Sequence, residues 1–200
     1  MGSGVLLFEA IANIKSFDEL PSVLLHTCCA PCAASVIQCL SEHFRITIFF
    51  YNPNIKAEDE YFKRAGELQK LLSSANFPNI EDVIVCDYNQ GEFDFVAAEY
   101  MDEPEGGKRC SLCFELRLRK SAEKAGDGFD YFASTLSVSP HKNAAIINQI
   151  GCAIAEQGKA GTNYLISDFK KRGGYQRSVE LSKQFGLYRQ RYCGCTLTNN

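Results

Sequence analysis

The sequence lacks the features that would direct a protein into or across a membrane. No apolar run approaches the length of a membrane span. Residues 1–14 contain Glu9 and no basic residue, so we expect no secretory signal peptide. We also find no internal repeat and no low-complexity linker. We therefore expect a cytoplasmic protein without a membrane partner, whose thiols stay reduced.

The size and composition of the chain are typical of one domain, or of one domain with a small appendage. Apolar residues make up 46% of the 200 residues, and 14 of them are phenylalanine. This is enough to build a core without cysteine cross-links. In a reduced compartment, cysteines more often serve metal binding or catalysis than structural disulfides.

Seven of the ten cysteines fall into three tight groups. These are Cys28, Cys29 and Cys32, then Cys110 and Cys113, then Cys193 and Cys195. Thiols spaced this closely can share a metal centre or exchange as a disulfide. Three groups exceed the needs of one redox pair, so the pattern favours iron–sulfur or other metal chemistry. A zinc ribbon is disfavoured, because about 15–20 residues usually separate its two pairs.

The other three cysteines, Cys39, Cys86 and Cys152, lie within apolar patterns, and we predict that they belong to the core. The Cys29-Ala-Pro-Cys32 segment is similar to a thioredoxin-type redox motif, in which a helix N-terminus stabilises a thiolate. Arg117 lies one helical turn beyond Cys113. Its positive charge would offset the negative charge of a thiolate-ligated cluster.

Strand and helix patterns alternate along the chain. We predict strands over residues 23–26, 46–51, 82–86 and 131–136, and helices over 33–42, 57–75, 93–101, 114–125, 139–156 and 173–185. This alternation predicts an α/β fold with a mostly parallel sheet flanked by helices. Sites in such folds lie beyond the carboxyl ends of the strands. We expect the three cysteine groups to meet there.

Positive charge is concentrated between Lys170 and Arg191. This segment has seven Lys or Arg and one acid, a charge of +6 that leaves −9 for the rest of the chain. One interpretation is a solvated helix face. The other is a nucleic-acid-binding surface, because tyrosines between the cations can stack on unpaired bases. The segment alone does not favour either.

Four segments together are similar to the QueH-type epoxyqueuosine reductases. They are residues 28–32, 132–143, 168–178 and 188–195. The resemblance covers about residues 23–195, and the long stretch from Asp168 to Cys195 is its most specific part. The twenty residues before Pro21 fall outside it. We therefore expect an N-terminal extension over residues 1–20 and a single α/β metalloenzyme domain over 21–200.

The resemblance implies a fold, a reaction and cofactors. The fold is nucleotide-hydrolase-like and related to the PP-loop enzymes, with a cysteine-rich C-terminal extension. The reaction reduces the epoxide of epoxyqueuosine, at the wobble position of tRNA, to the alkene of queuosine. The implied cofactors are a 4Fe–4S cluster and an additional iron or zinc ion. A ferredoxin or flavodoxin is the kind of electron donor expected.

Site residues follow from the resemblance and from the spacing of the motifs. We expect Cys28 or Cys29 to bind the cluster with Cys110 and Cys113. Cys32, Cys193 and Cys195 would then lie nearest the second metal. Candidate proton donors, or residues that support the metal ligands from behind, are His26, His141 and Asp168, although a lone histidine is more often structural. The expected tRNA-binding residues are Lys142, Asn143, Lys170, Lys171, Arg172, Tyr175, Arg177, Tyr188, Arg189 and Arg191.

Two other classes of function are compatible with the same cysteines. The first is a thiol–disulfide oxidoreductase that uses only Cys29 and Cys32, and it predicts a colourless protein. The second is a zinc-containing RNA-binding module without redox activity. The iron and sulfide content of anaerobically purified protein separates all three classes.

Overall fold

The fold is built around one six-stranded sheet in which all neighbouring strands run parallel. The computed structural model describes residues 4–14, 19–158 and 161–195. The strand order is β1-β6-β5-β2-β3-β4, and every pair is parallel. The strands are β1 (Gly4–Leu6), β2 (Ser22–His26), β3 (Arg45–Phe50), β4 (Ile80–Val85), β5 (Tyr131–Ser134) and β6 (Asn163–Ile166). The predicted α/β class is confirmed.

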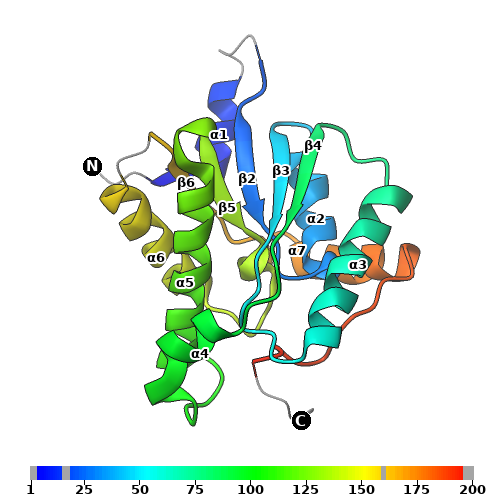
Figure 1. Ribbon diagram of the computed structural model, residues 1–200. Helices are drawn as coiled ribbons and strands as arrows, with labels where there is room; N and C mark the ends of the chain where they lie inside the picture. Colours follow the sequence, from blue (N-terminus) through cyan, green and yellow to red (C-terminus); the bar gives the residue numbers. More distant parts are fainter. Residues whose placement is uncertain (1–3, 15–18, 159–160, 196–200) are drawn as a thin grey trace.

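Helices cover both faces of this sheet (Figure 1). They are α1 (Leu7–Asn13), α2 (Ala30–Leu40), α3 (Glu58–Ser74), α4 (Gly91–Ala97), α5 (Lys108–Ala125), α6 (Ala144–Gln157) and α7 (Gly174–Gln184). One core cluster joins α1, α2, α3 and α7 to the sheet, and another joins α5 and α6 to its opposite face. None of the described helices is long and apolar enough to cross a bilayer.

The central strand β2 shows why the layers form. All five of its residues are buried. Val23 and Leu25 point into the cluster beneath α2 and α3, whereas Leu24 points into the cluster beneath α5 and α6. Successive side chains of a strand alternate between its two faces. A continuous apolar run is therefore what a parallel strand covered on both faces requires.

Several predicted boundaries were wrong. Helix α6 begins at Ala144 rather than at 139, because the side chain of Asn143 accepts hydrogen bonds from the backbone N–H groups of Ala145 and Ile146. Helix α5 begins at Lys108 rather than at 114. Strand β5 ends at Ser134, and a short 3-10 helix follows over Thr135–Val138.

The sequence patterns also missed β1, α1 and β6. Residues Gly4–Leu6 pair with Tyr164–Ile166, so the segment before Pro21 adds an edge strand to the sheet. The prediction that three cysteines belong to the core was wrong for Cys39, which is exposed on α2. Cys86 and Cys152 are partly buried and pack against the core.

The carboxyl ends of the strands all lie at one edge of the sheet, where the C-terminal segment of residues 187–195 also runs (Figure 1). Cys28 follows β2, Asn52 follows β3, and Ser139 follows the turn after β5. This edge is the expected position of a site in a parallel α/β fold.

Two helical glycines test how tightly α6 packs on the sheet. A Cβ atom at Gly151 would lie 2.6 Å from ring atoms of the buried Tyr164. Gly151→Ala should therefore lower the free energy of unfolding by about 1–3 kcal/mol. The matched control is Gly66→Ala on α3, where nothing lies within 4 Å, and it should raise stability by about 0.5–1 kcal/mol. Urea unfolding monitored by circular dichroism measures both, and equal changes would contradict this packing.

Candidate functional site

The first cysteine group spans the turn between β2 and α2 and the first turn of α2, where Cys32 lies. Cys29 is the N-cap residue of α2, and Pro31 lies in the first turn of that helix. The three sulfur atoms of Cys28, Cys29 and Cys32 lie within 4.8 Å of one another. The positive end of the helix dipole favours thiolates at this position.

The spacing of these sulfurs suits one metal ion. Around a tetrahedral ion with metal–sulfur bonds of about 2.3 Å, two sulfur atoms lie about 3.8 Å apart. The Sγ atoms of Cys28 and Cys29 are separated by 3.8 Å. Three thiols within 4.8 Å of one another, with one pair at the ideal spacing, therefore have both the chemistry and the arrangement to hold a single ion.

The other two cysteine groups meet at a second, smaller hollow. Cys110 and Cys113 lie on the first turns of α5, and Cys193 and Cys195 lie on the C-terminal segment. All four line this hollow. Cys113 and Cys195 are buried there against Phe93. Cys193 also lines the larger cavity that contains the first group.

The structure therefore places the seven cysteines in two adjoining sets. This grouping differs from the predicted ligand division, which joined Cys110 and Cys113 to the first group. The difference arises because the C-terminal segment packs its two sulfurs against the first turns of α5. The first set is Cys28, Cys29 and Cys32, and the second set is Cys110, Cys113, Cys193 and Cys195.

Helix α3 holds the C-terminal segment in place. The buried guanidinium of Arg64 forms an ion pair with Glu60 at 2.7 Å and donates a hydrogen bond to the carbonyl oxygen of Cys193 at 2.9 Å. The backbone N–H of Lys56 donates to the carbonyl oxygen of Gly194, also at 2.9 Å. Gly194 has a φ of 99°, a conformation that favours glycine. A Cβ atom there would lie only 3.3 Å from Arg64.

Arg117 is a fully buried cation beneath the site. Its Nε atom donates to Nε2 of His26 at 3.2 Å, and one terminal nitrogen donates to Oδ1 of Asn52. The other terminal nitrogen lies 3.9 Å from Sγ of Cys113. The one-turn spacing in the sequence thus places Arg117 beside Cys113. Among the described residues, no carboxylate forms an ion pair with it.

His26 lies below the cavity and does not line it. Burial, together with the Arg117 guanidinium, lowers the pKa of His26 to about 3, so the ring is neutral. Its Nδ1 atom lies 2.8 Å from Oγ of Ser134. The Nε2 atom of His26 also lies 3.0 Å from the backbone oxygen of Tyr51, so in one tautomer it accepts from Arg117 and in the other it donates to Tyr51. This arrangement supports Arg117 and does not place His26 near a substrate, where a proton donor was expected.

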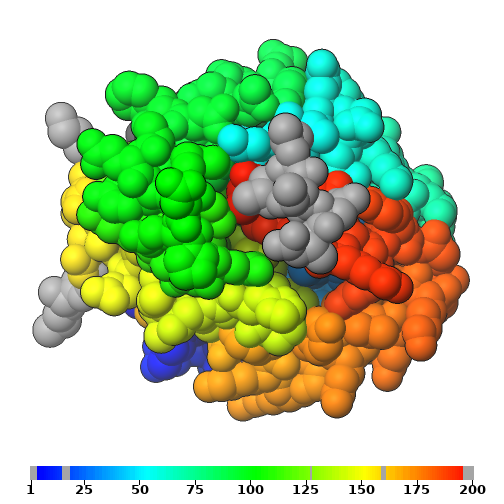
Figure 2. Space-filling model, turned by 90° about the horizontal axis from the view of Figure 1, so that it is seen from below, coloured from blue at the N-terminus to red at the C-terminus, as the bar shows by residue number. Residues whose placement is uncertain are grey.

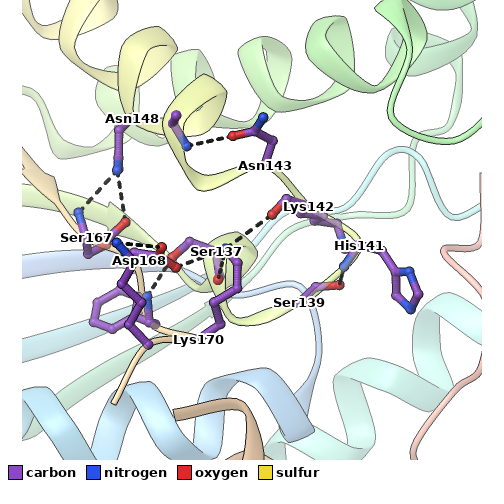
Figure 3. Close-up of polar contacts among 12 residues, drawn as sticks. Ser137, Ser139, His141, Lys142, Asn143, Asn148, Ser167, Asp168 and Lys170 are labelled. Carbon is purple, nitrogen blue, oxygen red and sulfur yellow. Dashed lines mark hydrogen bonds and ion pairs between the residues drawn. The ribbon is translucent and has the colours of Figure 1, made fainter. Parts of the chain in front are cut away.

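The other two candidate proton donors lie apart from each other. Asp168 forms ion pairs with Lys170 at 2.9 Å and Lys171 at 3.7 Å, and it does not line the cavity of the first cysteine group. Figure 3 shows the ring of His141 pointing away from Asp168 and Lys170. His141 does line the cavity. It is therefore the only one of the three candidates that does so.

Hydrogen bonds divide the thiols into ionised and neutral partners. Hydrogen bonds from Cys29 and Cys32 hold the pKa of Cys28 well below its usual range. The bond with Cys28 raises the pKa of Cys29 to about 11. A bond from Cys195, helped by Lys142 and Arg117, lowers the pKa of Cys193 to about 5 despite its burial. One thiolate is thus stabilised in each set.

Lys142 brings a second cation to the thiols. Burial by itself lowers the pKa of Lys142, but the negative charges of Cys193 and Cys28 outweigh it and hold that pKa above its ordinary value. The residue lines both the cavity and the smaller hollow. It therefore stays protonated between the two cysteine sets.

The first cysteine set lies at the floor of a cavity of about 400 Å³. Figure 2 shows this hollow between the yellow-green segment near residue 140 and the red C-terminal segment, with blue chain from the region of α2 at its floor. Four of the ten predicted tRNA-binding residues line it, namely Lys142, Tyr175, Arg189 and Arg191.

The remaining predicted tRNA-binding residues make contacts elsewhere. Asn143 caps α6, and the ammonium group of Lys170 contacts the backbone carbonyls of Ser137 and Lys142 (Figure 3). The Tyr188 hydroxyl contacts Glu60. The last three interact with side chains outside the cavity: Lys171 with Asp168, Arg172 with the Phe8 ring, and Arg177 with Glu180.

The residues that line the cavity and that sequence patterns missed include Asn54, Glu105 and Gln190. A signal was present for Asn54, because the Asn-Pro-Asn turn directly follows the predicted strand over 46–51, at the carboxyl edge. Gln190 lies between two cations of the basic segment. No local pattern singles out Glu105 among the acids of its loop.

Comparison with known proteins adds a second line of evidence. A sequence model of the family described as epoxyqueuosine reductase QueH matches residues 23–200. The relative named epoxyqueuosine reductase QueH in Streptococcus pyogenes serotype M1 is 46% identical over 178 residues, which cover 88% of this chain and 69% of the relative.

Two further relatives have the same name. The protein of Staphylococcus epidermidis is 41% identical over 195 residues, covering 95% of this chain and 81% of the relative. The protein of Thermotoga maritima is 37% identical over 182 residues, covering 88% of this chain and 90% of the relative. These matches agree with the resemblance carried by the cysteine groups and the basic segment. The chain belongs to the epoxyqueuosine reductase QueH family.

Proposed function

We propose that this protein reduces the epoxide of epoxyqueuosine in tRNA to the alkene of queuosine. The observation that carries the proposal is the gathering of seven cysteines around two adjoining hollows at the carboxyl edge of the sheet. The names of its relatives, and the large share of the chain that they match, support the same reaction. The reaction consumes one epoxide, two electrons and two protons, and it yields one alkene and one water molecule.

The two cysteine sets suggest how the metals are divided. We assign Cys110, Cys113, Cys193 and Cys195 to a 4Fe–4S cluster, for which four thiolates are the common ligand set. We assign Cys28, Cys29 and Cys32 to a single iron or zinc ion, because their sulfur spacing suits one tetrahedral ion. Catalytic metal sites often have three protein ligands and keep one position open.

The residues around the thiols supply positive charge and a proton site. When bound, the metals would supply electrons and a Lewis acid, which are the two contributions that removal of an epoxide oxygen requires. Lys142, which stays protonated beside Cys28 and Cys32, stabilises negative charge that develops on an oxygen in the cavity. His141 at the cavity edge is positioned to hold a proton.

The basic residues at the cavity suit an RNA substrate. The guanidinium of Arg189 lies 5.3 Å from the centre of the Tyr175 ring. Arg191 lines the same cavity. Cations of this kind contact phosphates, and exposed aromatic rings stack on unpaired bases. A ferredoxin or flavodoxin in a reduced cytoplasm would deliver the electrons and keep the seven thiols available.

The reaction itself can be tested directly. Iron-loaded protein, supplied with a strong low-potential reductant and tRNA that carries epoxyqueuosine, should accumulate queuosine, as measured by mass spectrometry of the nucleosides. A colourless protein that contains only zinc and forms no queuosine would instead favour an RNA-binding module. Disulfide exchange that depends only on Cys29 and Cys32 would favour a thiol–disulfide oxidoreductase.

The assignment of metals predicts different losses from the two cysteine sets. Cys113→Ser should lose most of the cluster, and with it acid-labile sulfide and visible absorbance. Cys29→Ser should lose about one metal ion per chain and keep the sulfide. Cys39→Ser, at an exposed cysteine outside the site, serves as the control and should lose neither. Metal and sulfide analysis of anaerobically purified protein decides the matter, and the reverse pattern would refute the assignment.

The position of the cations predicts which of them bind RNA. Arg189→Glu combined with Arg191→Glu should weaken binding of an anticodon stem-loop at least tenfold and reduce the salt slope by about 1.5. Arg172→Glu combined with Arg177→Glu makes the same change of charge away from the cavity, and it should have little effect. Fluorescence anisotropy at several salt concentrations measures both. Equal losses of affinity in the two double variants would mean that RNA binding depends on net charge and not on the residues at the cavity.

A further inference from the structure

The wall of the cavity contains two amide side chains whose carbonyl oxygens lack a partner. Asn54, which is 2% exposed, follows β3, and Gln190 belongs to the C-terminal segment. Their oxygens, Oδ1 and Oε1, are buried and accept no hydrogen bond from the part of the chain that the structure describes. Both residues line the cavity that contains the first cysteine set.

The other end of each amide faces a sulfur atom. Nδ2 of Asn54 donates to Sγ of Cys193 at 3.8 Å. The side chain of Gln190 forms a hydrogen bond with Cys29. A cysteine that ligates a metal is a thiolate and can only accept a hydrogen bond. Each amide must therefore turn its N–H₂ group toward sulfur and leave its carbonyl oxygen free.

The neighbouring Asn52 shows that a free carbonyl oxygen is not a general property of this loop. Its Nδ2 atom donates to the backbone oxygen of Thr27 at 2.9 Å, and its Oδ1 atom accepts from Arg117. Both ends of that amide are satisfied within the protein. A buried acceptor without a partner is unfavourable, and a cavity wall is a place where a ligand can supply the missing donor.

We propose that Asn54 and Gln190 recognise the hydroxyl groups of the epoxide-bearing ring of the substrate. This inference rests on the proposed function. Two free acceptors select a ligand group that carries O–H or N–H, which excludes the epoxide oxygen and an ionised phosphate. The amides adjoin Cys193 and Cys29, one in each cysteine set, so they border the place where the epoxide must react. The hydroxyl groups of the same ring are the donors nearest to that place.

The test compares two RNAs that differ only in the ring. One anticodon stem-loop carries epoxyqueuosine, and the other carries 7-aminomethyl-7-deazaguanine, which has the same base without the ring. Asn54→Leu and Gln190→Met keep the size of each side chain and remove its amide. Each should raise the Kd for the ring-bearing RNA about fivefold and leave the Kd for the ringless RNA unchanged. The same variants should raise KM for epoxide reduction by a similar factor.

Gln184→Met, at an exposed glutamine on α7 outside the cavity, is the matched control and should change neither affinity. Iron and sulfide content confirms that each variant keeps its metals. If Asn54→Leu does not fold, Gln190→Met carries the test alone.

The outcomes separate this inference from the proposed function. A wild-type protein that binds both RNAs equally and forms no queuosine would overturn the function itself. If the wild type binds the ring-bearing RNA more tightly than the ringless RNA and the variants keep this difference, only the role of the amides would be overturned. Equal losses on both RNAs would also overturn it, because they would indicate a structural role.

Discussion

The burial of one guanidinium, which no carboxylate of the described residues pairs with, is the constraint on which the site depends. Arg117 contacts the strand end at His26, the loop at Asn52 and the sulfur of Cys113. It thereby joins α5 to the carboxyl ends of β2 and β3. An unpaired buried cation is strongly unfavourable, so the fold requires negative charge nearby. The thiolates provide that charge, which means that the cysteines and the core beneath them stabilise each other.

The site is assembled from distant parts of the chain. Cys193 reaches the first turns of α5 because Arg64 on α3 holds the backbone of the C-terminal segment. Cys28 and Cys29 precede α2 and Cys32 lies in its first turn, where the close sulfurs would suit a single ion. Four cysteines come from two segments, where a larger cluster has room for separate ligands. The proposed division of metals thus follows from which segments supply the thiols.

Much of the fold could be predicted from local patterns. The strands over 23–26 and 46–51 and the helix over 57–75 were recognised, because apolar periodicity there is strong. Strand β6 was missed because its four residues are too short to show a period. The start of α6 was misplaced because Pro140 is a common early helix residue, whereas the side chain of Asn143 provides the actual cap.

The sequence by itself determined the fold class, the three cysteine groups and the family, since each depends on spacing along the chain. Only the tertiary structure decided which thiols stand together, and it placed Arg189 and Arg191 at the cavity and Arg172 and Arg177 away from it. It also showed that, within the part of the chain that the structure describes, the carbonyl oxygen of Asn54 has no partner whereas that of Asn52 has one. Local spacing cannot reveal these facts, because partners in space are set by how the segments pack.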